Sequence, residues 1–473
     1  MSTVRFCQRN GSNCIFLDNI LLPLGRFLEW SRAIYIILVT GLALRIAALS
    51  MVAHVPLRNE APGYMQMALQ LLHHENFAPY WPPGVPYYLL FAQRLFGESI
   101  LVARASILLV YLAFTVFLFF FIRRIAGLRA ANLAAVIFVF YPPYVRDSFN
   151  PSTEYPAAAT LMAIVFLVTL AGRKSGFTTL MLTGLALGAL ILIRPSSLLV
   201  ALFVLLYLLK RSRKLWVPLV PLVIAALLVS AWLWKAYSMT GRFVRINDSN
   251  SQNFFWGNNP YTPIYTTWGE GQDALGMSSA YRAELAAITS QPPEVQNQLY
   301  TKLAVHYILS RPDLFLLRSF NRSRAYFGFP VHYAEPLKTV MGVKGRKWIS
   351  LLLTAADVAF YWPLMMLAIV FLFIDDHSLL PSDHRLALLG AVAAYALPYW
   401  FSEAQPRFNF PVVPLIAVLA VLLIELLLRK PASEVLRPVI VSVRRRRALL
   451  VALVAFVYIQ IEWIYMAYFH LRY

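Results

Sequence analysis

Long apolar runs separated by short polar segments fill most of the chain from about residue 33 onward. An α-helix needs about 20 mostly apolar residues to cross the hydrocarbon core of a bilayer. About eleven runs approach that length, so the pattern predicts an all-α polytopic membrane protein with about eleven transmembrane helices. The runs lie at about 33–53, 100–122, 130–145, 155–171, 177–194, 196–209, 215–235, 350–374, 386–402, 411–428 and 448–469.

The composition of the chain agrees with a membrane protein. Of its 473 residues, 59% are hydrophobic and only 14% are charged, whereas a soluble domain carries about 25% charged residues. The net charge of +20 does not indicate nucleic-acid binding, because Lys and Arg cluster between the apolar runs rather than along one polar face. Cys7 and Cys14 lack C-x-x-C spacing and a nearby His, so we expect free thiols on the reducing side rather than a metal site.

The basic clusters predict the orientation of the chain. With the N-terminus in the cytoplasm, the Lys and Arg clusters of the short loops all fall on the cytoplasmic side. They are Arg123, Arg124 and Arg129; Arg173 and Lys174; Lys210, Arg211, Arg213 and Lys214; His384 and Arg385; and Arg429, Lys430 and Arg444 to Arg447. No cleavable signal peptide is expected, because the first long apolar run begins only near Ala33.

This orientation gives an expected domain organisation. A cytoplasmic tail occupies residues 1–32, and a transmembrane module occupies 33–235 and includes the first outside loop, 54–99. A large extracytoplasmic loop follows at 236–349, and C-terminal transmembrane helices at 350–473.

The first outside loop places a carboxylate, Glu60, just beyond the first apolar run, in the stretch NEAPGY. Residues 64–75 then show apolar positions at helical spacing, which predicts an amphipathic helix along the membrane surface. Trp81, Tyr87 and Tyr88 suit an interfacial aromatic belt. One interpretation is that these residues only anchor the loop.

The second outside loop, YPPYVRDSFNPSTEYP, carries Arg146, Asp147 and Glu154. Glu154 begins the fourth apolar run, where a carboxylate can stabilise a helix N-terminus. The other interpretation is that Glu154 faces the same cavity as Glu60, because ionisable groups at membrane depth usually line a site or find a partner.

The large outside loop contains two further segments of interest. Residues 245–271 are dense in Asn, Gly, Pro and aromatics, including Asn258 and Asn259; they predict a structured loop that holds a sugar or head group, or whose polar groups satisfy one another. Residues 296–327 predict amphipathic helices bearing four arginines, either as an anchor to anionic lipid or as a phosphate-binding element. The arginines are Arg311, Arg318, Arg322 and Arg324.

The last outside segment, FSEAQPRFNFPVVP, contains Glu403 and Arg407 before the tenth apolar run. A planar guanidinium beside a lipid-embedded cavity suits a phosphate or pyrophosphate. An ion pair between Glu403 and Arg407 is the alternative interpretation.

Together these segments resemble the GT-C superfamily of integral-membrane glycosyltransferases, in particular the bacterial group related to protein mannosyltransferases and lipid A aminoarabinose transferases. That group carries a D-x-x-x-Y motif in the first outside loop, an A-x-x-L helix, a P-P-G turn and an L-F-G close. The corresponding stretches here are EAPGYMQMALQLL, PPGVPYYLLFAQRLFGES and ARAS. Further matches are the second loop with Glu154, GLALGALILIRPSSLL with Arg194 and Pro195, WGNNP, and RFNFPVVP. The resemblance spans about residues 40–430, and Glu60 stands where the family usually has Asp.

The resemblance implies an inverting transfer of a sugar from a polyprenyl-phosphate donor to a lipid, glycan or protein acceptor, on the outer face of a bacterial inner membrane. Its implied roles are Glu60 as base, Glu154 as acceptor-orienting group or, with Glu60, as ligand of a divalent cation, and Arg407 with Arg318, Arg322 and Arg324 as donor-phosphate ligands. Tyr64, Asn258 and Asn259 are expected to support the loops. His73 and His74 are expected to be surface residues.

Two rival functions share the apolar, many-spanned pattern. A transporter or flippase of polyprenyl-linked sugars more often shows duplicated halves, and the sequence has no internal repeat. An O-antigen polymerase or ligase would also have a large outside loop with arginines, but the acid-and-tyrosine loop after the first run argues against it. Arg45, Asp357, Glu425 and Glu462 fall inside apolar runs, where charges are usually paired or functional.

Overall fold

The computed structural model describes residues 25–146, 150–171, 176–212, 214–264, 278–329, 347–374 and 380–465. Cys7, Cys14 and Asp147 lie outside these described residues. The helices from the N-terminus to the first large polar segment are α2 Ala33–Val52, α3 Ala61–Leu72, α4 Gly84–Phe96, α5 Ile100–Ala126, α6 Leu128–Phe140, α7 Pro142–Arg146, α8 Glu154–Leu170, α9 Phe177–Ile193, η2 Pro195–Leu198, α10 Leu199–Ser212 and α11 Trp216–Thr240. The remaining helices are α12 Ser249–Gly257, α13 Ser279–Thr289, α14 Pro293–Ser310, α15 Pro312–Tyr326, α17 Lys347–Phe373, α18 Ser382–Phe401, η4 Pro406–Asn409, α19 Val413–Arg429, α20 Ala432–Val435, α21 Arg437–Val441 and α22 Val443–Tyr465.

Each predicted apolar run coincides with a helix, which confirms the all-α membrane class. Within the described residues, six helices are long and apolar enough to cross a membrane: α2, α5, the continuous stretch of η2 and α10, α11, α17 from Leu352, and α22. Shorter apolar helices are α6, α8 and α9. The predicted number of about eleven spans therefore stays a prediction, and the chain is an integral multi-pass membrane protein.

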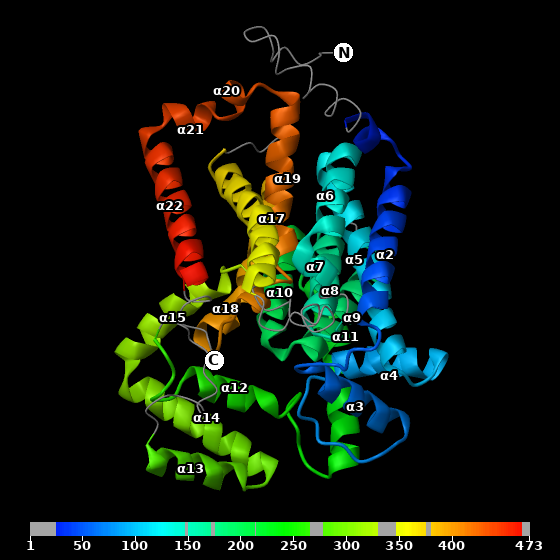
Figure 1. The fold of residues 1–473 in the computed structure, drawn as a ribbon, viewed down its shortest axis with the longest axis vertical. Coiled ribbons are helices and arrows are strands. Elements are labelled where there is room, and N and C mark those ends of the chain that lie inside the picture. The colour runs from blue at the N-terminus through cyan, green and yellow to red at the C-terminus, as the bar shows by residue number, and fades with distance from the viewer. Residues whose placement is uncertain are drawn as a thin grey trace.

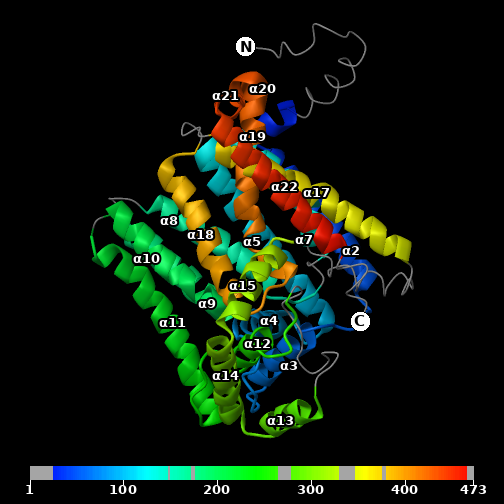
Figure 2. The ribbon, with the colours of Figure 1, turned by 90° about the vertical axis from the view of Figure 1, so that its left-hand side faces the viewer.

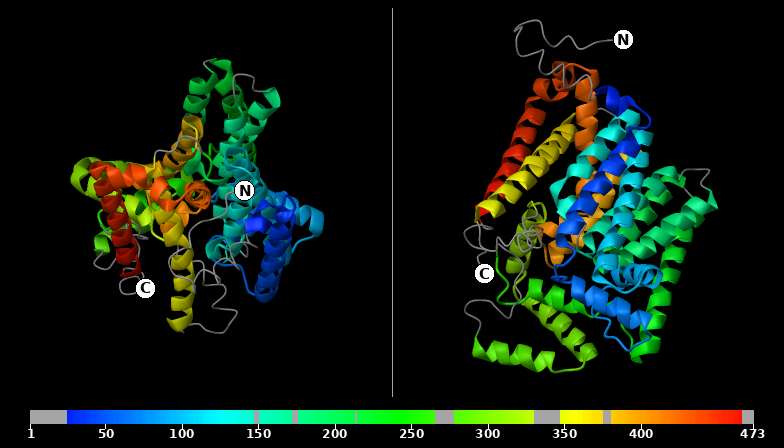
Figure 3. Two further views of the ribbon diagram at one scale, coloured as in Figure 1. Left: turned by 90° about the horizontal axis from the view of Figure 1, so that it is seen from above. Right: turned by 45° about the vertical axis from the view of Figure 1, so that its right-hand side comes forward.

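The long helices lie side by side along the long axis of the molecule (Figure 1). The α20 and α21 segment lies at one end with the start of α2, whereas α3, α4 and α12 to α14 gather at the other (Figure 1). The α10 and α11 pair and the α17 and α22 pair form opposite flanks (Figure 2). Seen from above, α19 lies near the middle (Figure 3).

Helix α19 is the centre of the bundle, because it packs against α5, α6, α8, α17 and α18 and is buried on nearly all sides. Its neighbour α6 contributes small residues to the contacts, namely Ala130, Ala131, Ala134 and Ala135, all fully buried. Small side chains let membrane helices approach closely, which favours dispersion contacts where the surrounding lipid offers no hydrophobic driving force.

The four charged groups predicted inside apolar runs all have partners. Arg45 is buried, donates to the carbonyls of Gly41 at 3.1 Å and Val139 at 3.2 Å, and stacks on Tyr111. The other partners are Arg146 for Asp357, Arg129 and Arg429 for Glu425, and Arg324 for Glu462. Pairing offsets the cost of removing these charges from water.

The polar end of the molecule joins two segments that are far apart in the chain. The start of α12 donates backbone hydrogen bonds to the first outside loop, from Asp248 to Pro79 at 2.9 Å and from Ser249 to Tyr80 at 3.2 Å. The Tyr80 hydroxyl donates to Gln252 at 2.8 Å. The first loop and the α12 segment therefore form one surface at the end of the bundle.

Candidate active site

Glu60 is placed by the turn that leads from α2 into α3. Arg104 on α5 donates to the carbonyl of Val52 and, at 2.7 Å, to that of Val55, which fixes the chain as it leaves α2. Asn59 then adopts a left-handed conformation with φ of 56°, which Asn tolerates better than most residues. Glu60 follows directly at the N-terminal end of α3, with its side chain free of any capping bond to that helix.

The Glu60 carboxylate meets Arg407, which lies 347 positions away in the sequence. The guanidinium donates from Nη2 to Glu60 Oε1 at 2.6 Å, and the Tyr64 hydroxyl donates to Glu60 Oε2 at 3.3 Å. Both partners of the ion pair keep 25% of their side chains exposed, so the pair lies at a surface that a ligand can reach.

The environment of Glu60 stabilises its ionised form. Burial acts to raise the pKa of the carboxyl, but the charge and hydrogen bond of Arg407 outweigh it, with smaller contributions from Arg194 and Tyr64. The pKa of Glu60 therefore lies below its ordinary value. Burial and the Glu60 charge raise the pKa of Tyr64 well above its ordinary value, so its hydroxyl stays protonated and donates.

Glu154 is fully buried and held by a polar network. Arg194 donates to Glu154 Oε1 at 2.7 Å, to the Thr153 hydroxyl at 2.9 Å and to the Tyr399 hydroxyl at 2.9 Å. The Ser196 hydroxyl also donates to Tyr399, at 2.7 Å. Three elements thus fix the carboxylate: α8, the turn after α9 and the end of α18.

Arg407 also approaches Glu154, since its Nε lies 4.0 Å from Glu154 Oε1. The guanidinium groups of Arg194 and Arg407 also lie over the ring of Phe408, at 4.9 and 5.3 Å from its centroid. Cations and carboxylates therefore alternate along this cluster. The resulting order is Arg194, Glu154, Arg407 and Glu60. The structure therefore brings Glu60, Glu154 and Arg407 together, but Glu154 is buried behind the cavity that Glu60 and Arg407 line.

Of these groups, Glu60, Arg194 and Arg407 line a cavity of about 930 Å³. Its charged lining consists of Glu60, Arg194, Glu403 and Arg407, and Gln405 donates to Glu403 at 2.6 Å. Burial raises the pKa of Glu403 above its ordinary value. Aromatic and amide side chains line the rest, namely Tyr64, Tyr80, Trp81, Asn250, Asn253, Phe254, Trp256, Tyr399, Phe401 and Phe408. The lining suits a ligand with hydroxyl groups, an anionic group and apolar faces.

The structure shows which residues of the first loop line the cavity and which are exposed. Trp81, predicted for an interfacial belt, lines the cavity and packs edge-to-face on Tyr64 with centroids 5.3 Å apart. His73 and His74 are exposed, as predicted. Among the described residues, no cluster of three or more His, Cys, Asp or Glu side chains is arranged for a metal ion.

Replacement of Gly63 by Ala tests the packing that positions Glu60. A Cβ at Gly63 would lie 2.1 Å from Trp81 Nε1, so the ring must move away from α3. Overpacking of this kind costs about 1–3 kcal/mol of unfolding free energy. We expect Gly63→Ala to lower the thermal midpoint in detergent. In Gly176→Ala the new Cβ has no neighbour within 4 Å, and that variant is expected to match the wild type; equal midpoints for both variants would contradict the argument.

The arginines of α15 do not face the cavity. Arg318 and Arg322 are buried and donate to backbone carbonyls, Arg318 to Asn259 at 3.0 Å and to Thr262, and Arg322 to Gly257 and, at 3.4 Å, to Trp400. Arg324 pairs with Glu462. These contacts hold the segment after α12, and Arg407 is the predicted phosphate ligand that the cavity contains.

Asn258 and Asn259 belong to the same segment. Asn258 donates to the carbonyls of Phe254 at 3.0 Å and Phe401 at 3.1 Å, and Asn259 donates to Phe255 at 3.1 Å. A Cβ at Gly257 would lie 1.8 Å from the Ser402 carbonyl oxygen, so the close approach of this segment to the end of α18 requires glycine. The role of loop support stays a prediction with this geometry behind it.

Arg194 and Tyr399 were not predicted as site residues. Arg194 had a signal in the sequence, because a cation at the end of an apolar run must find a partner. Tyr399 had none, since one tyrosine within a run of aromatics is typical of the membrane interface.

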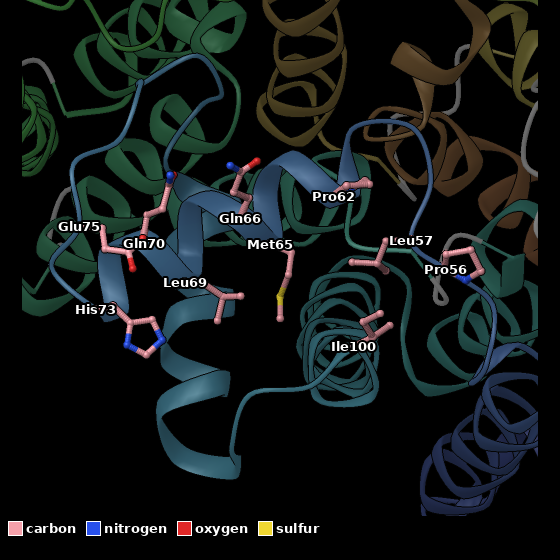
Figure 4. Close-up of a pocket in the computed structure, with 10 residues that line it drawn as sticks. All are labelled: Pro56, Leu57, Pro62, Met65, Gln66, Leu69, Gln70, His73, Glu75 and Ile100. Atoms are coloured by element: carbon pink, nitrogen blue, oxygen red, sulfur yellow. The ribbon is translucent and has the colours of Figure 1, made fainter.

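A second hollow of about 620 Å³ lies on the opposite face of α3. Its lining is mostly apolar, with Met65 and Leu69 of α3 near Leu57 and Ile100 (Figure 4). His73 at its edge lies 2.9 Å from Glu98. Neither Glu60 nor Arg407 lines it, so the candidate site is the larger cavity.

Three solved structures align with most of this chain at low similarity. The archaeal oligosaccharyltransferase AglB from Archaeoglobus fulgidus, in complex with an inhibitory peptide and a dolichol-phosphate, is 15% identical with a TM-score of 0.46 over 89% of this chain and 54% of its own. An Archaeoglobus fulgidus oligosaccharyltransferase complex with Zn and sulfate is 16% identical with a TM-score of 0.49 over 89% and 52%. ArnT from Cupriavidus metallidurans bound to undecaprenyl phosphate is 14% identical with a TM-score of 0.42 over 83% and 78%. The chain spans about half the length of the two oligosaccharyltransferases, and scores this low carry no argument of their own.

The comparison of the sequence with protein families is more direct. No curated protein matches the chain significantly. Residues 81–234 match the family model of dolichyl-phosphate-mannose-protein mannosyltransferases. This stretch includes Glu154 and Arg194, whereas Glu60 and Arg407 lie outside it. The matched third of the chain is therefore similar to a family of membrane mannosyltransferases, which agrees with the resemblance to GT-C glycosyltransferases that the order of motifs indicated.

Proposed function

We propose that the protein transfers a sugar from a polyprenyl-phosphate donor to an acceptor hydroxyl, at the extracytoplasmic face of the membrane. The observation that carries the proposal is the contact between Glu60 and Arg407 at 2.6 Å in the large cavity. It joins a carboxylate able to accept a proton to a cation able to bind a phosphate. The family match supports the donor class, because the description of the matched family names dolichyl-phosphate-mannose, which is a sugar carried on a polyprenyl phosphate.

The proposed reaction uses each group once. Glu60 accepts the proton of the acceptor hydroxyl, whose oxygen attacks the anomeric carbon of the donor sugar. The bond between that carbon and the phosphate oxygen breaks, and the electron pair leaves with the polyprenyl phosphate. Arg407 stabilises the negative charge that develops on the departing phosphate. Attack opposite the leaving group inverts the anomeric configuration.

The resting ion pair suggests how donor binding prepares the base. Arg407 holds the pKa of Glu60 below its ordinary value against the effect of burial. A donor phosphate that draws the guanidinium toward itself leaves the partly buried Glu60 carboxylate with less of the positive charge that offsets the effect of burial. The pKa of Glu60 then rises, and the carboxylate becomes a stronger base when the donor is in place.

Glu154 has a positioning role in this proposal. Its carboxylate is bound to Arg194 at 2.7 Å and lies 4.0 Å from Arg407 Nε. It therefore lies beside the guanidinium that pairs with Glu60, and Arg194 in turn holds the Glu154 side chain in place. Orientation of the acceptor, the role predicted for Glu154, would require it to leave this network.

The proposal is tested by transfer of radiolabelled sugar from polyprenyl-phosphate donors in proteoliposomes. We expect label to leave the donor and appear in a lipid, glycan or protein fraction, and the labelled fraction identifies the acceptor class. A second measurement uses the same vesicles with the donor in one leaflet only. It distinguishes a transferase from a transporter, because a transporter moves the donor to the other leaflet. Movement of intact donor across the bilayer without loss of its sugar would overturn the proposal in favour of a flippase.

A further inference from the structure

Helix α15 buries two of its arginines inside the protein. Arg318 and Arg322 are buried within the protein at 2% and 0% exposure, and Asn321 lies on the same face and donates to Ile264 at 2.8 Å. The opposite face, at helical spacing, presents Leu316, Leu317 and Phe320. A helix in water has the reverse arrangement, because its apolar stripe faces the core.

The apolar face of α15 continues onto its neighbours. Leu309 of α14 is 75% exposed, and Leu316 and Phe320 of α15 are 67% and 64% exposed. Phe401, at the end of α18, is also exposed and lies against Phe315, with ring centroids 6.2 Å apart. We call this surface the α15 patch: Val305, Leu309, Leu316, Leu317, Phe320 and Phe401.

The ends of two apolar helices set the level of the patch. Helix α15 packs against α18 and α22, and it lies beside their lower ends in Figures 1 and 2. Its C-terminal turn is tied to α22 by the Arg324 and Glu462 pair. Since α22 is long and apolar enough to cross the membrane, its end is expected near the membrane surface, and α15 lies beside that end.

The charged groups at the edge of the patch agree with this level. Arg311 and Asp313 in the first turn of α15 pair with each other, with Nη2 2.8 Å from Oδ2. The pair carries no net charge. On α14, Lys302 and His306 are exposed on the same face as Val305 and Leu309, so they form a polar border of the patch on that helix.

We propose that the α15 patch is embedded in the lipid leaflet on the cavity side of the membrane, and that its contacts are made with acyl chains. The arrangement of charges on α15 favours contact with hydrocarbon over contact with an anionic head-group surface, because Arg318 and Arg322, which could bind phosphates, are turned inward. Phe401 belongs to the patch and also lines the cavity. The lipid therefore reaches the edge of the cavity, which, if the proposed function holds, lets a lipid-linked donor approach without leaving the leaflet.

The test uses nitroxide labels in proteoliposomes of phosphatidylcholine and phosphatidylglycerol. Cys7 and Cys14 are first replaced by Ser, and single cysteines are introduced as Phe320→Cys and Leu316→Cys. Leu109→Cys on the exposed face of α5 serves as the lipid reference, and Ala287→Cys on the exposed face of α13 as the water reference. Power saturation with oxygen and with a water-soluble nickel chelate then measures the environment of each label.

We expect the labels at 316 and 320 to be accessible to oxygen and protected from the nickel chelate, as at 109, at a depth of about 5–10 Å. Accessibility to the chelate equal to that at 287 would overturn the proposal in favour of a water-exposed face. Protection from both reagents would also overturn it, since a protein surface would then cover the patch. No outcome depends on sugar transfer, so this proposal and the proposed function can fail separately.

Discussion

Replacement of Glu60 by Gln is expected to lower the rate of sugar transfer by about 10²–10⁴-fold, the contribution typical of a general base. Gln keeps the size of the side chain, and its amide oxygen can still accept from Arg407 and Tyr64. The variant cannot accept the acceptor proton, so the loss should appear in kcat. The measurement is the initial rate of label transfer at saturating donor, with the thermal midpoint as a check on folding.

Two further variants make this result specific. Glu75→Gln changes an exposed carboxylate that follows the same helix, and it should transfer at the wild-type rate. Glu60→Asp restores the residue type that the family usually has, but it withdraws the carboxylate by a methylene from a site built around Glu. A displacement of about 1 Å can cost roughly a hundredfold, so we expect partial activity. Full transfer by Glu60→Gln would show that another group is the base.

Replacement of Arg407 by Gln is expected to lower kcat by about 10²–10³-fold, the loss typical when one group that stabilises a developing anion is removed. The variant loses the cation that pairs with Glu60 in the cavity. Arg407→Lys keeps the charge but not the planar pair of donors, so we expect it to retain part of the activity. The measurement is kcat for transfer with each variant.

Arg407→Gln should also change the pH dependence of kcat/KM for sugar transfer in a defined direction. In the wild type the pKa of Glu60 lies below its ordinary value because Arg407 outweighs burial. Without Arg407 the effect of burial dominates, and the pKa of Glu60 rises. The base must be ionised to act, so the acid limb of kcat/KM should move to higher pH in Arg407→Gln.

A matched control separates this effect from a general loss of charge. Arg282→Gln on α13 removes an exposed arginine, and both its rate and its acid limb should stay as in the wild type. If Arg407→Gln lowers the rate with an unchanged acid limb, the ion pair does not set the charge state of Glu60. If it transfers at the wild-type rate, Arg407 does not bind the donor phosphate.

The positions of the helices could be predicted from the sequence, because hydropathy acts locally. A run such as 177–194 must form its backbone hydrogen bonds within itself in lipid, so it becomes a helix wherever it lies; the structure has α9 at Phe177–Ile193. The turn at Pro195 follows from the missing N–H in the same way. The NEAPGY stretch that contains Glu60 could also be recognised from the sequence, because a polar motif directly after the first apolar run must lie in the loop that follows this run.

The partners of the charges could not be predicted. Arg318 and Arg322 had the residue type and the helical spacing of a phosphate-binding element, yet both donate to the carbonyls that follow α12. The sequence indicated Arg407 only through one motif of low specificity, yet Arg407 is the arginine that pairs with Glu60. Which of several like charges reaches a site depends on how the helices pack.

The sequence by itself determined the membrane class, the helices and the motifs of the superfamily, since these depend on residue type and on neighbours along the chain. Only the tertiary structure decided that Glu60, Glu154, Arg194 and Arg407 form one charged cluster, and that α15 turns Arg318 and Arg322 inward and its leucines outward. Both results come from contacts between distant segments, where burial of a charge is tolerated only if a partner from another helix meets it.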